Sequence, residues 1–332
     1  MKWVRGIISL LVVSLLVVGM HGVAQAKTYR VGISQWSGYS PANVADVKGF
    51  WKAQGLDVAV FVLPGNPAVQ KALAQKRIEM SVDITGFAVE HVMEGTPVTV
   101  IAEIDWSNGG DKIMVRKGLA PEALKGQVIG TYDDSAASLL FIYRFLKDYG
   151  LKITDVNRVI FETSELPQRM RATKMAAIVC YDPYALEVEK DGTAVLGAST
   201  ADYLGSIADS ITMRTDVLQA MPREDVVKFL KGWIQAAEWI KDEANWPEYA
   251  RILQEKLYLG DPAMTDAVLR DILTGVSIHD AATLRQQHQP GQGIFVHLHD
   301  LKTALAENQL LKKDFTPEDL VDTSFLLEAL GE

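Results

Sequence analysis

The sequence predicts an α/β protein made of two doubly wound lobes joined by two crossing strands. Strand-like and helix-like segments alternate from residue 29 to residue 105, and the alternation restarts after a glycine-containing stretch and continues to about residue 199. From residue 223 onward the apolar spacing is helical. Alternation of this kind favours largely parallel sheets with helices on both faces. We therefore expect lobe one to hold residues 27–112 and 212–332, and lobe two to hold residues 113–211.

The first lobe begins with four strand-like runs separated by helices. Pro41 suits the first turn of a helix that we expect to run to about Gln54, where Gly55 stops it. Residues 56–63 have the β-branched, apolar character of a buried strand. The predicted strands of this lobe are 29–34, 56–63, 78–84 and 98–105, and its predicted helices are 41–54, 67–76 and 86–95.

The second lobe repeats the pattern, and a helical tail follows it. Ala136, Leu139, Leu140, Tyr143 and Leu146 recur at helical spacing behind a cap at 133–135. The predicted strands are 127–132, 156–161, 176–180 and 194–198, with 210–214 as the return crossing, and the predicted helices are 136–150, 166–173 and 183–192. The tail should belong to lobe one, with helices over 223–241, 246–257, 263–273, 297–307 and 317–321.

The N-terminus has the composition of an export signal. A short basic lead with Lys2 and Arg5 precedes an apolar run, and the segment ends in a small-x-small pattern at Ala24 and Ala26. The run is short for a membrane span, so we expect residues 1–26 to be a cleaved signal peptide, with an uncleaved anchor as the alternative. The mature protein should therefore be soluble and periplasmic.

Charge and cysteine content exclude several classes of protein. The formal net charge of −9 makes the chain a poor binder of nucleic acid or anionic membranes. Cys180 is the one cysteine, so the chain forms no internal disulfide and no cysteine-rich metal site. We expect Cys180 to be a small buried hydrophobe. The sequence suggests no cofactor.

The stretch 105–115 joins the two predicted lobes. It contains a tryptophan, hydrogen-bonding side chains, the glycines Gly109 and Gly110 and two carboxylates, between two apolar strand-like runs. Adjacent glycines allow backbone angles that other residues resist, so the chain can bend here and approach a ligand. We interpret the stretch as lining a cleft and carrying the chain between lobes. The alternative is an ordinary polar loop.

Several motifs, in order along the chain, carry a resemblance to one family. They are GISQWSGY at 32–39, KGFWKAQGLDV at 48–58, SNGGD at 107–111, LKGQVIG at 124–130 and AAIVCYDPY at 176–184. The chain resembles the solute-binding proteins of ABC importers, in particular the nitrate/sulfonate/taurine-type family, which has the type 2 periplasmic-binding fold. The resemblance implies a monomer that closes around a small-molecule solute. It also implies delivery of the solute to an inner-membrane ABC permease and its ATPase.

The loops that follow the strands in both lobes are rich in acids and aromatic rings. Ligands of doubly wound sheets bind at such loops, beyond the carboxyl ends of the strands. The loop carboxylates are Asp83, Asp105, Asp111, Asp133, Asp134, Asp182, Asp202 and Asp209, the aromatic residues are Trp36, Tyr39, Trp106, Tyr132, Tyr181 and Tyr203, and the one base is Lys112.

This balance favours a small cationic or hydrogen-bond-donating nitrogen compound, such as an amine, an amidine, a guanidinium or a small heterocycle. An anion would need uncommitted helix N-terminal amides and preferably a cation. Asp133 and Asp134 stand where either can satisfy those amides at the first helix of lobe two. Aromatic faces would attract a cation as well. A nitrate, sulfonate or taurine-like anion is the alternative.

The candidate ligand-binding residues come from the loops of both lobes. They are Gln35, Trp36, Tyr39, Asp83, Thr85, Asp105, Trp106, Ser107, Asn108, Asp111, Tyr132, Asp133, Asp134, Ser135, Tyr181 and Asp182. Several have a purely structural alternative. Trp36 and Trp106 suit packing between lobes, Asp133 suits a helix cap, and Asp111 suits a brace for the hinge.

Catalysis and metal binding have little support in the sequence. It contains no Gly-x-Ser-x-Gly elbow, phosphate-binding loop or His-Glu-x-x-His pair. We expect His288, His297 and His299 to be solvated surface histidines rather than metal ligands. Synthases of the thiamine pyrimidine precursor share the fold that the resemblance implies and are a disfavoured alternative, because they carry a cysteine-rich motif and this chain has one cysteine. A ligand-sensing subunit that docks on a membrane receptor stays open as an alternative to a transport receptor.

Overall fold

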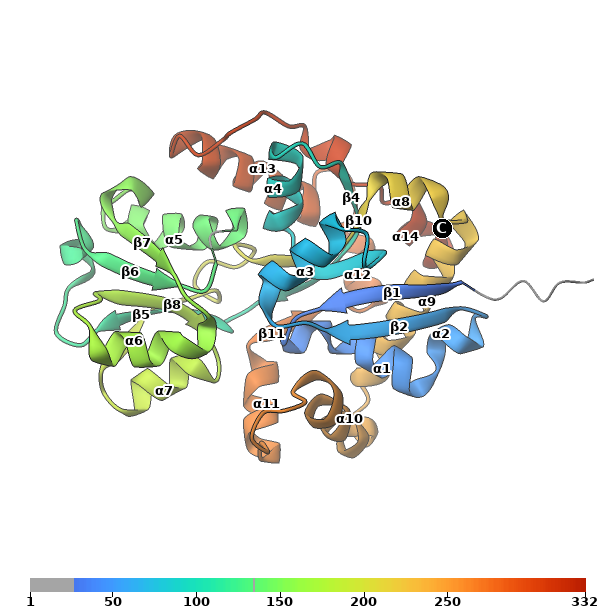
Figure 1. Ribbon diagram of the computed structural model, residues 1–332, viewed down its shortest axis with the longest axis horizontal. Helices are drawn as coiled ribbons and strands as arrows, with labels where there is room; N and C mark the ends of the chain where they lie inside the picture. The colour runs from blue at the N-terminus through green and yellow to red at the C-terminus, as the bar shows by residue number, and fades with distance from the viewer. Residues whose placement is uncertain (1–26, 134) are drawn as a thin grey trace, which may run out of the picture.

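The protein consists of two α/β halves, each built on its own β-sheet and flanked by helices (Figure 1). The computed structural model describes residues 27–133 and 135–332. The expected signal peptide, residues 1–26, and Asp134 therefore lie outside the described residues. Across the two described ranges, no helix is both long enough and apolar enough to cross a bilayer. The predicted fold class, with two α/β lobes and a helical C-terminal region, is confirmed.

The first sheet has six strands in the order β11-β4-β10-β3-β1-β2. They are β1 (Thr28–Ile33), β2 (Asp57–Val62), β3 (Met80–Ile84), β4 (Val98–Ser107), β10 (Ala208–Arg214) and β11 (Val276–Ile278). β1 pairs in parallel with β2 and β3, whereas β10 is antiparallel to β3 and β4. Because β10 returns from the other half, it begins at the edge where β3 and β4 end.

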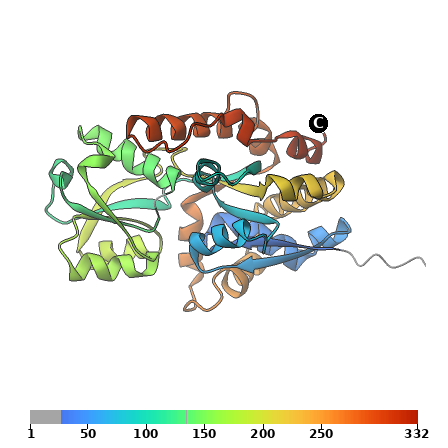
Figure 2. The same cartoon turned by 45° about the horizontal axis from the view of Figure 1, so that its top comes forward.

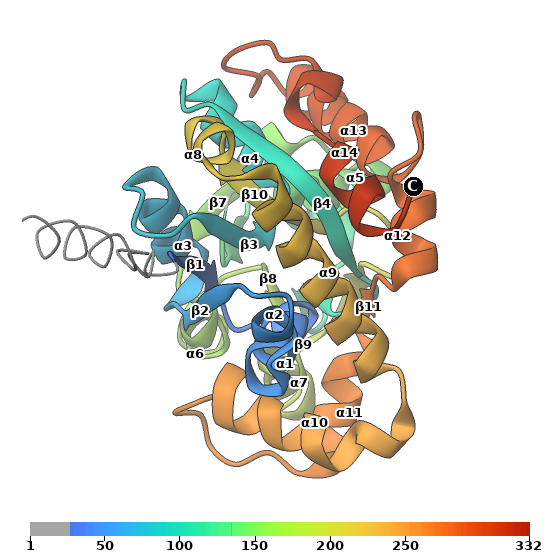
Figure 3. The same ribbon diagram turned by 90° about the vertical axis from the view of Figure 1, so that its right-hand side faces the viewer.

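The helices of the first half pack on this sheet around α9. They are α1 (Ser40–Lys48), α2 (Phe50–Ala53), α3 (Gly65–Ala74), α4 (Gly86–Met93), α8 (Thr215–Ala220) and α9 (Arg223–Ile240). α9 contacts α1, α2 and the C-terminal helix α14 (Ser324–Ala329), as Figure 3 shows. The predicted apolar stripe is buried, including Val226, Leu230 and Trp233. Burial of this stripe in one core cluster secures α9 to the first half.

The second sheet has five strands in the order β7-β6-β8-β5-β9. They are β5 (Asp111–Arg116), β6 (Val128–Thr131), β7 (Asn157–Ile160), β8 (Ala177–Tyr181) and β9 (Ala194–Ser199), with helices α5 (Ala136–Asp148), α6 (Leu166–Ala172) and α7 (Tyr184–Lys190). β6 is parallel to β7 and β8, and β5 is antiparallel to β8 and β9. Each sheet thus contains an antiparallel crossing strand that begins at the edge facing the other half.

The C-terminal helices contact both halves. They are α10 (Trp246–Ile252), which continues as a π-helical turn over Leu253–Leu257, α11 (Asp266–Thr274), α12 (Ala281–Gln287), α13 (Gly293–Glu307) and α14. α13 lies against α5 of the second half (Figure 2). Between these helices Arg144 Nη2 is 2.7 Å from Asp300 Oδ2. The division of the chain at residues 112 and 211 stays a prediction.

Hydrogen bonds join the two crossings to each other. The first crossing, residues 108–110, follows β4, and the second, residues 200–207, precedes β10. Thr200 Oγ1 lies 2.7 Å from Ser107 Oγ and accepts a hydrogen bond from Gly109 N at 2.8 Å. Thr200 N donates to Asp111 O at 2.9 Å. The two chain segments therefore form one bonded link between the halves.

Two details of the first half differ from the sequence prediction. The helix predicted from Pro41 to Gln54 is divided into α1 and α2, because Gly49 adopts a left-handed conformation with φ of 70° and caps α1. The strand predicted as buried over 56–63 is β2, which is the edge of its sheet and only partly covered; its Phe61 is 45% exposed.

Candidate functional site

A small cavity lies where the crossing strands meet the carboxyl ends of β3 and β8. The side chains around it leave a cavity volume of only about 20 Å³. Its lining residues come from both halves and are Ser34, Trp36, Tyr39, Asn66, Ile84, Asp111, Tyr132, Tyr181, Ile207 and Asp209. This volume is little more than the room that one water molecule needs and far less than a usual ligand pocket, so the halves must move apart before a solute can enter.

Aromatic rings from both halves form the cavity wall. The Trp36 ring of the first half lies edge-on to the Tyr181 ring of the second, with centroids 5.9 Å apart. Tyr132 also meets Tyr181 edge-on, at 5.2 Å. Of the aromatic candidates Trp36, Trp106, Tyr132 and Tyr181, three therefore converge at the cavity. The fourth, Trp106, points elsewhere and packs against His279 at 5.5 Å.

A pair of buried carboxyl groups lies on the first-half side of the cavity. Asp209, the second residue of β10, pairs with Asp105 near the end of β4, and neither residue is more than 1% exposed. Trp36 Nε1 donates to Asp105 Oδ1 at 3.1 Å, and the Tyr39 hydroxyl donates to Asp209. Burial raises the pKa of Asp105 to about 7, and burial together with the Asp105 charge raises the pKa of Asp209 well above its usual range. The two carboxyls therefore share a proton near neutral pH.

A second acid, Asp111, lines the cavity from the other half. It is the first residue of β5 and pairs with Tyr181 at the end of β8. Tyr132 Oη donates to Asp111 Oδ1 at 2.7 Å, and the Asp111 backbone amide donates to Ser107 Oγ at 3.0 Å. Burial raises the pKa of Asp111 to about 6, against the lowering effect of these side-chain hydrogen bonds. Asp111 is thus both a cavity acid and a brace of the crossing.

Two further acids are buried around the cavity without appearing in its wall. Asp83, at 1% exposure, accepts a hydrogen bond from Gln70 Nε2, and burial raises its pKa to about 7. Burial likewise raises the pKa of Asp133 to about 6. Asp133 Oδ2 accepts a weak hydrogen bond from Asn66 Nδ2 at 3.5 Å, which links the two halves beside the cavity.

The groups that would attract an anion are already engaged by carboxylates of the chain itself. Lys112, the base of these loops, forms an ion pair with Asp182. At the start of α5, Ser135 N donates to Asp133 Oδ1 at 3.1 Å and Ala136 N donates to Glu90 Oε1 at 2.9 Å. These amides and the helix dipole are the usual attraction for an anionic ligand.

The remaining predicted site residues lie outside the cavity wall. The Ser135 side chain caps α5 by accepting from Ser138 N, and Asn108 N donates to Gly275 O. Thr85 is buried at the start of α4, and Gln35 is partly exposed in the loop after β1. The structure therefore brings together Trp36, Tyr39, Asp111, Tyr132 and Tyr181 at the cavity, with Asp105 behind Trp36.

Sequence reasoning did not select several cavity residues. These are Ser34, Asn66, Ile84, Ile207 and Asp209. Asp209 is one of the loop acids but not one of the candidate ligand-binding residues. The signal that points to it is the antiparallel direction of the return strand, which places the first residues of that strand at the edge facing the ligand. Asn66 follows β2 and accepts from Ser34 Oγ at 2.9 Å, a pairing that no local pattern indicates.

The expectation of solvated histidines is wrong for His288 and His297. His288 is 1% exposed, and its Nε2 accepts from Glu103 N at 2.7 Å, while His297 on α13 is 3% exposed and contacts Gly205 O at 2.9 Å. They are buried because each bonds a backbone group that the core would otherwise leave unpaired. His299 is exposed. In the part of the chain that the structure describes, no group of three or more His, Cys, Asp or Glu side chains is arranged to hold a metal.

Two lobes joined by two crossings, with a cavity between them, define the two-lobed periplasmic-binding fold. The chain belongs to the NMT1-like family, whose sequence pattern matches residues 23–254. A search of curated proteins by sequence finds no match. The resemblance to the nitrate/sulfonate type of periplasmic binding protein is confirmed by the family and by solved structures of the same fold.

Three solved structures illustrate the similarity. The alkanesulfonate-binding protein SsuA from Xanthomonas axonopodis pv. citri, bound to MOPS, superposes with a TM-score of 0.70 at 18% identity, covering 89% of this chain and 98% of that one. The nitrate-binding protein NrtA from Synechocystis PCC 6803 gives 0.70 at 14% identity, covering 92% and 89%. The ligand-binding component of an ABC-type import system from Staphylococcus aureus, with zinc bound, gives 0.71 at 15% identity, covering 91% and 99%. At these identities the likeness concerns the fold.

Proposed function

We propose that this protein is the extracytoplasmic solute-binding component of an ABC importer, exported by the signal in residues 1–26. Its solute would be a small cationic or donor-rich nitrogen compound. The fold and the family support the transport role, because relatives of this fold include binding proteins of import systems. The solute would be enclosed between the halves and delivered to a membrane permease.

The observation that carries the ligand class is the acidic, aromatic lining of the cavity. Asp209 and Asp111 face the same small space from opposite halves, and Trp36, Tyr132 and Tyr181 wall it. Buried acids favour a charge partner, since an unpaired buried charge is costly. An organic cation would supply that partner and could also stack on the rings, which contributes roughly 0.5–2 kcal/mol.

The same features disfavour the anions that the similar sulfonate- and nitrate-binding proteins are named for. An anion in the cavity would meet two carboxyl groups. Lys112 is paired with Asp182, and the first amides of α5 donate to Asp133 and Glu90. Binding an anion would require one of these internal pairs to break.

A thermal-shift screen on protein unfolded and refolded to remove co-purified ligand tests the proposal. The panel contains agmatine, acetamidine, an aminopyrimidine, nitrate, methanesulfonate and taurine at matched ionic strength. A compound that binds the native state raises the melting temperature by mass action, and we expect the rise among the nitrogen compounds. A response to methanesulfonate or nitrate alone would overturn the ligand class.

The cavity acids supply the matched variants. Asp209→Asn and Asp111→Asn each remove one acidic group that faces the solute, so the affinity for the responding cation should fall by roughly tenfold or more. Asp319→Asn, an exposed acid of the C-terminal region, serves as the control and should bind unchanged. Equal affinities in all three variants would contradict a ligand held by the cavity acids.

A further inference from the structure

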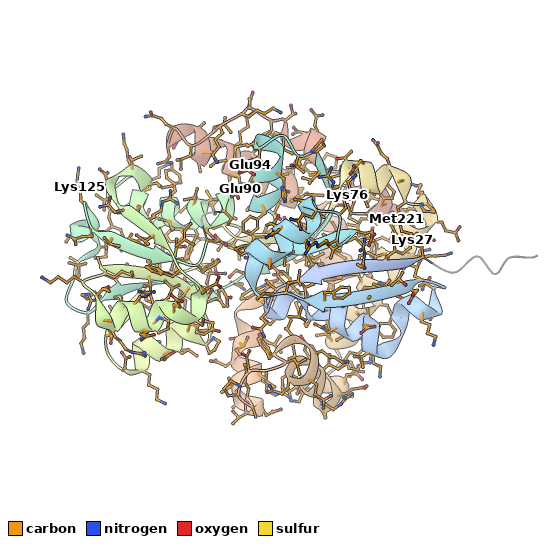
Figure 4. The ribbon with its side chains drawn as sticks, viewed as in Figure 1. Lys27, Lys76, Glu90, Glu94, Lys125 and Met221 are labelled. Carbon is orange, nitrogen blue, oxygen red and sulfur yellow. The ribbon has the colours of Figure 1, made fainter. Side chains whose placement is uncertain are left out.

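A second contact between the halves lies beside the cavity, where α4 of the first half meets the start of α5 in the second. Glu90 on α4 reaches across, and its Oε1 accepts the hydrogen bond of Ala136 N at 2.9 Å. Figure 4 labels Glu90 and Glu94, one turn further along α4. Glu90 is partly buried, whereas Glu94 is exposed.

Carboxylates from both halves accept hydrogen bonds at the start of α5. The Asp133 carboxylate of the second half accepts a hydrogen bond from the Ser135 backbone amide, and the Glu90 carboxylate of the first half accepts one from the Ala136 backbone amide. First-turn amides of a helix have no partner within the helix, and the helix dipole makes a negative group favourable there. Because Glu90 belongs to the other half, its hydrogen bond exists only while the halves are together.

Gly86 shows that the backbones of α4 and α5 approach closely here. A Cβ atom at Gly86 would lie 2.5 Å from Ala137 N and 3.0 Å from Ala136 N. Both neighbours are backbone atoms that a side chain cannot push aside. A glycine at the start of α4 is therefore required for Glu90 to reach its partner.

The Glu90 position is also open to solvent on one side. A groove lined by Gln70, Phe87, Glu90, His91, Glu94 and Asp133, among others, borders it. Tyr132 lines both this groove and the inner cavity. A small ion could therefore reach the Ala136 amide if the Glu90 carboxylate were removed.

We propose that the Glu90 carboxylate holds the two halves closed. It extends from the first half to the N-terminus of α5 and occupies the place there that a small anionic ligand would otherwise take. This carboxylate thereby favours the closed arrangement without ligand and excludes anions from this helix end. The exclusion rests on the proposed cationic ligand class, whereas the closing role does not depend on it.

Small-angle scattering of the ligand-free, refolded protein tests the closing role. Glu90→Ala removes the hydrogen-bonding carboxylate, so we expect a larger radius of gyration than in the wild type. Glu94→Ala removes an acid from the same helix without touching α5 and should leave the scattering unchanged. An unchanged radius of gyration in Glu90→Ala would overturn the proposal.

Anion addition provides a second readout. Formate, nitrate and methanesulfonate, added against chloride at equal ionic strength, should raise the melting temperature of Glu90→Ala in a saturable way and reverse its expansion. Wild type and Glu94→Ala should not respond. Absence of any anion response in an expanded Glu90→Ala would also contradict a carboxylate that stands in for an anion.

If Glu90→Ala does not fold, Glu90→Gln replaces it in the test. The glutamine side chain keeps the shape of glutamate and a neutral hydrogen-bond acceptor. The radius of gyration of Glu90→Gln should lie between those of the wild type and Glu90→Ala, because the charge that interacts with the α5 dipole is gone. Scattering identical to that of the wild type would then overturn the proposal. Since these measurements use no cationic ligand, a failed cation screen would refute the ligand class and leave the Glu90 contact standing.

Discussion

At the scale of single residues, the most unusual feature is the set of buried carboxyls with raised pKa values. Burial raises the pKa values of Asp83 and Asp105 to about 7 from an ordinary value of 3.8. A carboxyl whose pKa is higher in the folded than in the unfolded chain holds its proton more tightly when folded. Its contribution to stability is therefore complete below about pH 4 and is lost as the pH rises towards 7.

Replacing Asp105 with asparagine should flatten this pH dependence. The introduced amide can accept from Trp36 and donate to Asp209, which replaces the shared proton with a permanent donor. We expect the melting temperature of the ligand-free wild type to fall from pH 5 to pH 8 and that of Asp105→Asn to fall less. At pH 8 the variant should be more stable by roughly 1–3 kcal/mol, since each pKa unit corresponds to about 1.4 kcal/mol.

Thermal melts at several pH values across this range measure the effect. The exposed Asp319→Asn variant is the control and should follow the wild-type curve. Parallel curves for Asp105→Asn and wild type would mean that the two buried carboxyls do not share a proton.

At the scale of elements, the site depends on the two antiparallel crossing strands. β10 and β5 are antiparallel to their neighbours and begin at the edges where those neighbours end, so their first residues face the opposite half. Asp209 is the second residue of β10 and Asp111 the first of β5. The cavity acids therefore sit at equivalent places in the two sheets, and the chain direction brings them to one cavity.

The α9 helix depends on a close approach to α2. A Cβ atom at Gly232 would lie 2.3 Å from Trp51 Cδ1, and Trp51 is fixed by stacking on Phe229 at 5.0 Å and by donating from Nε1 to Phe229 O at 2.9 Å. Gly232→Ala should gain up to about 1 kcal/mol of helix propensity but lose more through overpacking, which costs roughly 1–3 kcal/mol. We expect net destabilisation by chemical denaturation.

The exposed neighbour Lys231 provides the control on the same helix. Lys231→Ala should change the free energy of unfolding by less than about 0.5 kcal/mol. A Gly232→Ala variant as stable as wild type would show that Trp51 can move aside.

The sequence predicts the elements well where periodicity and turn residues are strong, as in α9 and α5. It does not predict β11, a three-residue strand whose place depends on pairing with residues 105–107 of β4. It indicates the acidic, aromatic loops, yet it does not separate Trp36, which lines the cavity, from Trp106, which packs on His279. In the sequence both stand near glycines after a strand-like run, but in the structure Trp106 belongs to β4 whereas Trp36 lies in the loop after β1.

At the scale of the whole molecule, several connections hold the halves together. The two crossings are bonded to each other through Thr200, and α13 packs on α5 far along the sequence. The Glu90 contact joins the halves on the side of α4. A hinge motion must therefore keep the bonded crossings and α13 in place while the cavity side opens.

The Thr200 hydroxyl is the centre of this bonded link, so its removal should loosen both crossings at once. Thr200→Val keeps the shape but takes this partner away from Ser107 Oγ and Gly109 N at a buried position. An unmade hydrogen bond of this kind costs roughly 1–3 kcal/mol.

Hydrogen exchange of the ligand-free protein should become faster over residues 107–111 and 199–201, with the core strands β1 and β3 unaffected. Thr303→Val, at an exposed position on α13, should leave exchange at the crossings unchanged. If exchange rises across both sheets equally, Thr200 supports global stability rather than the hinge, and the crossings move independently of it.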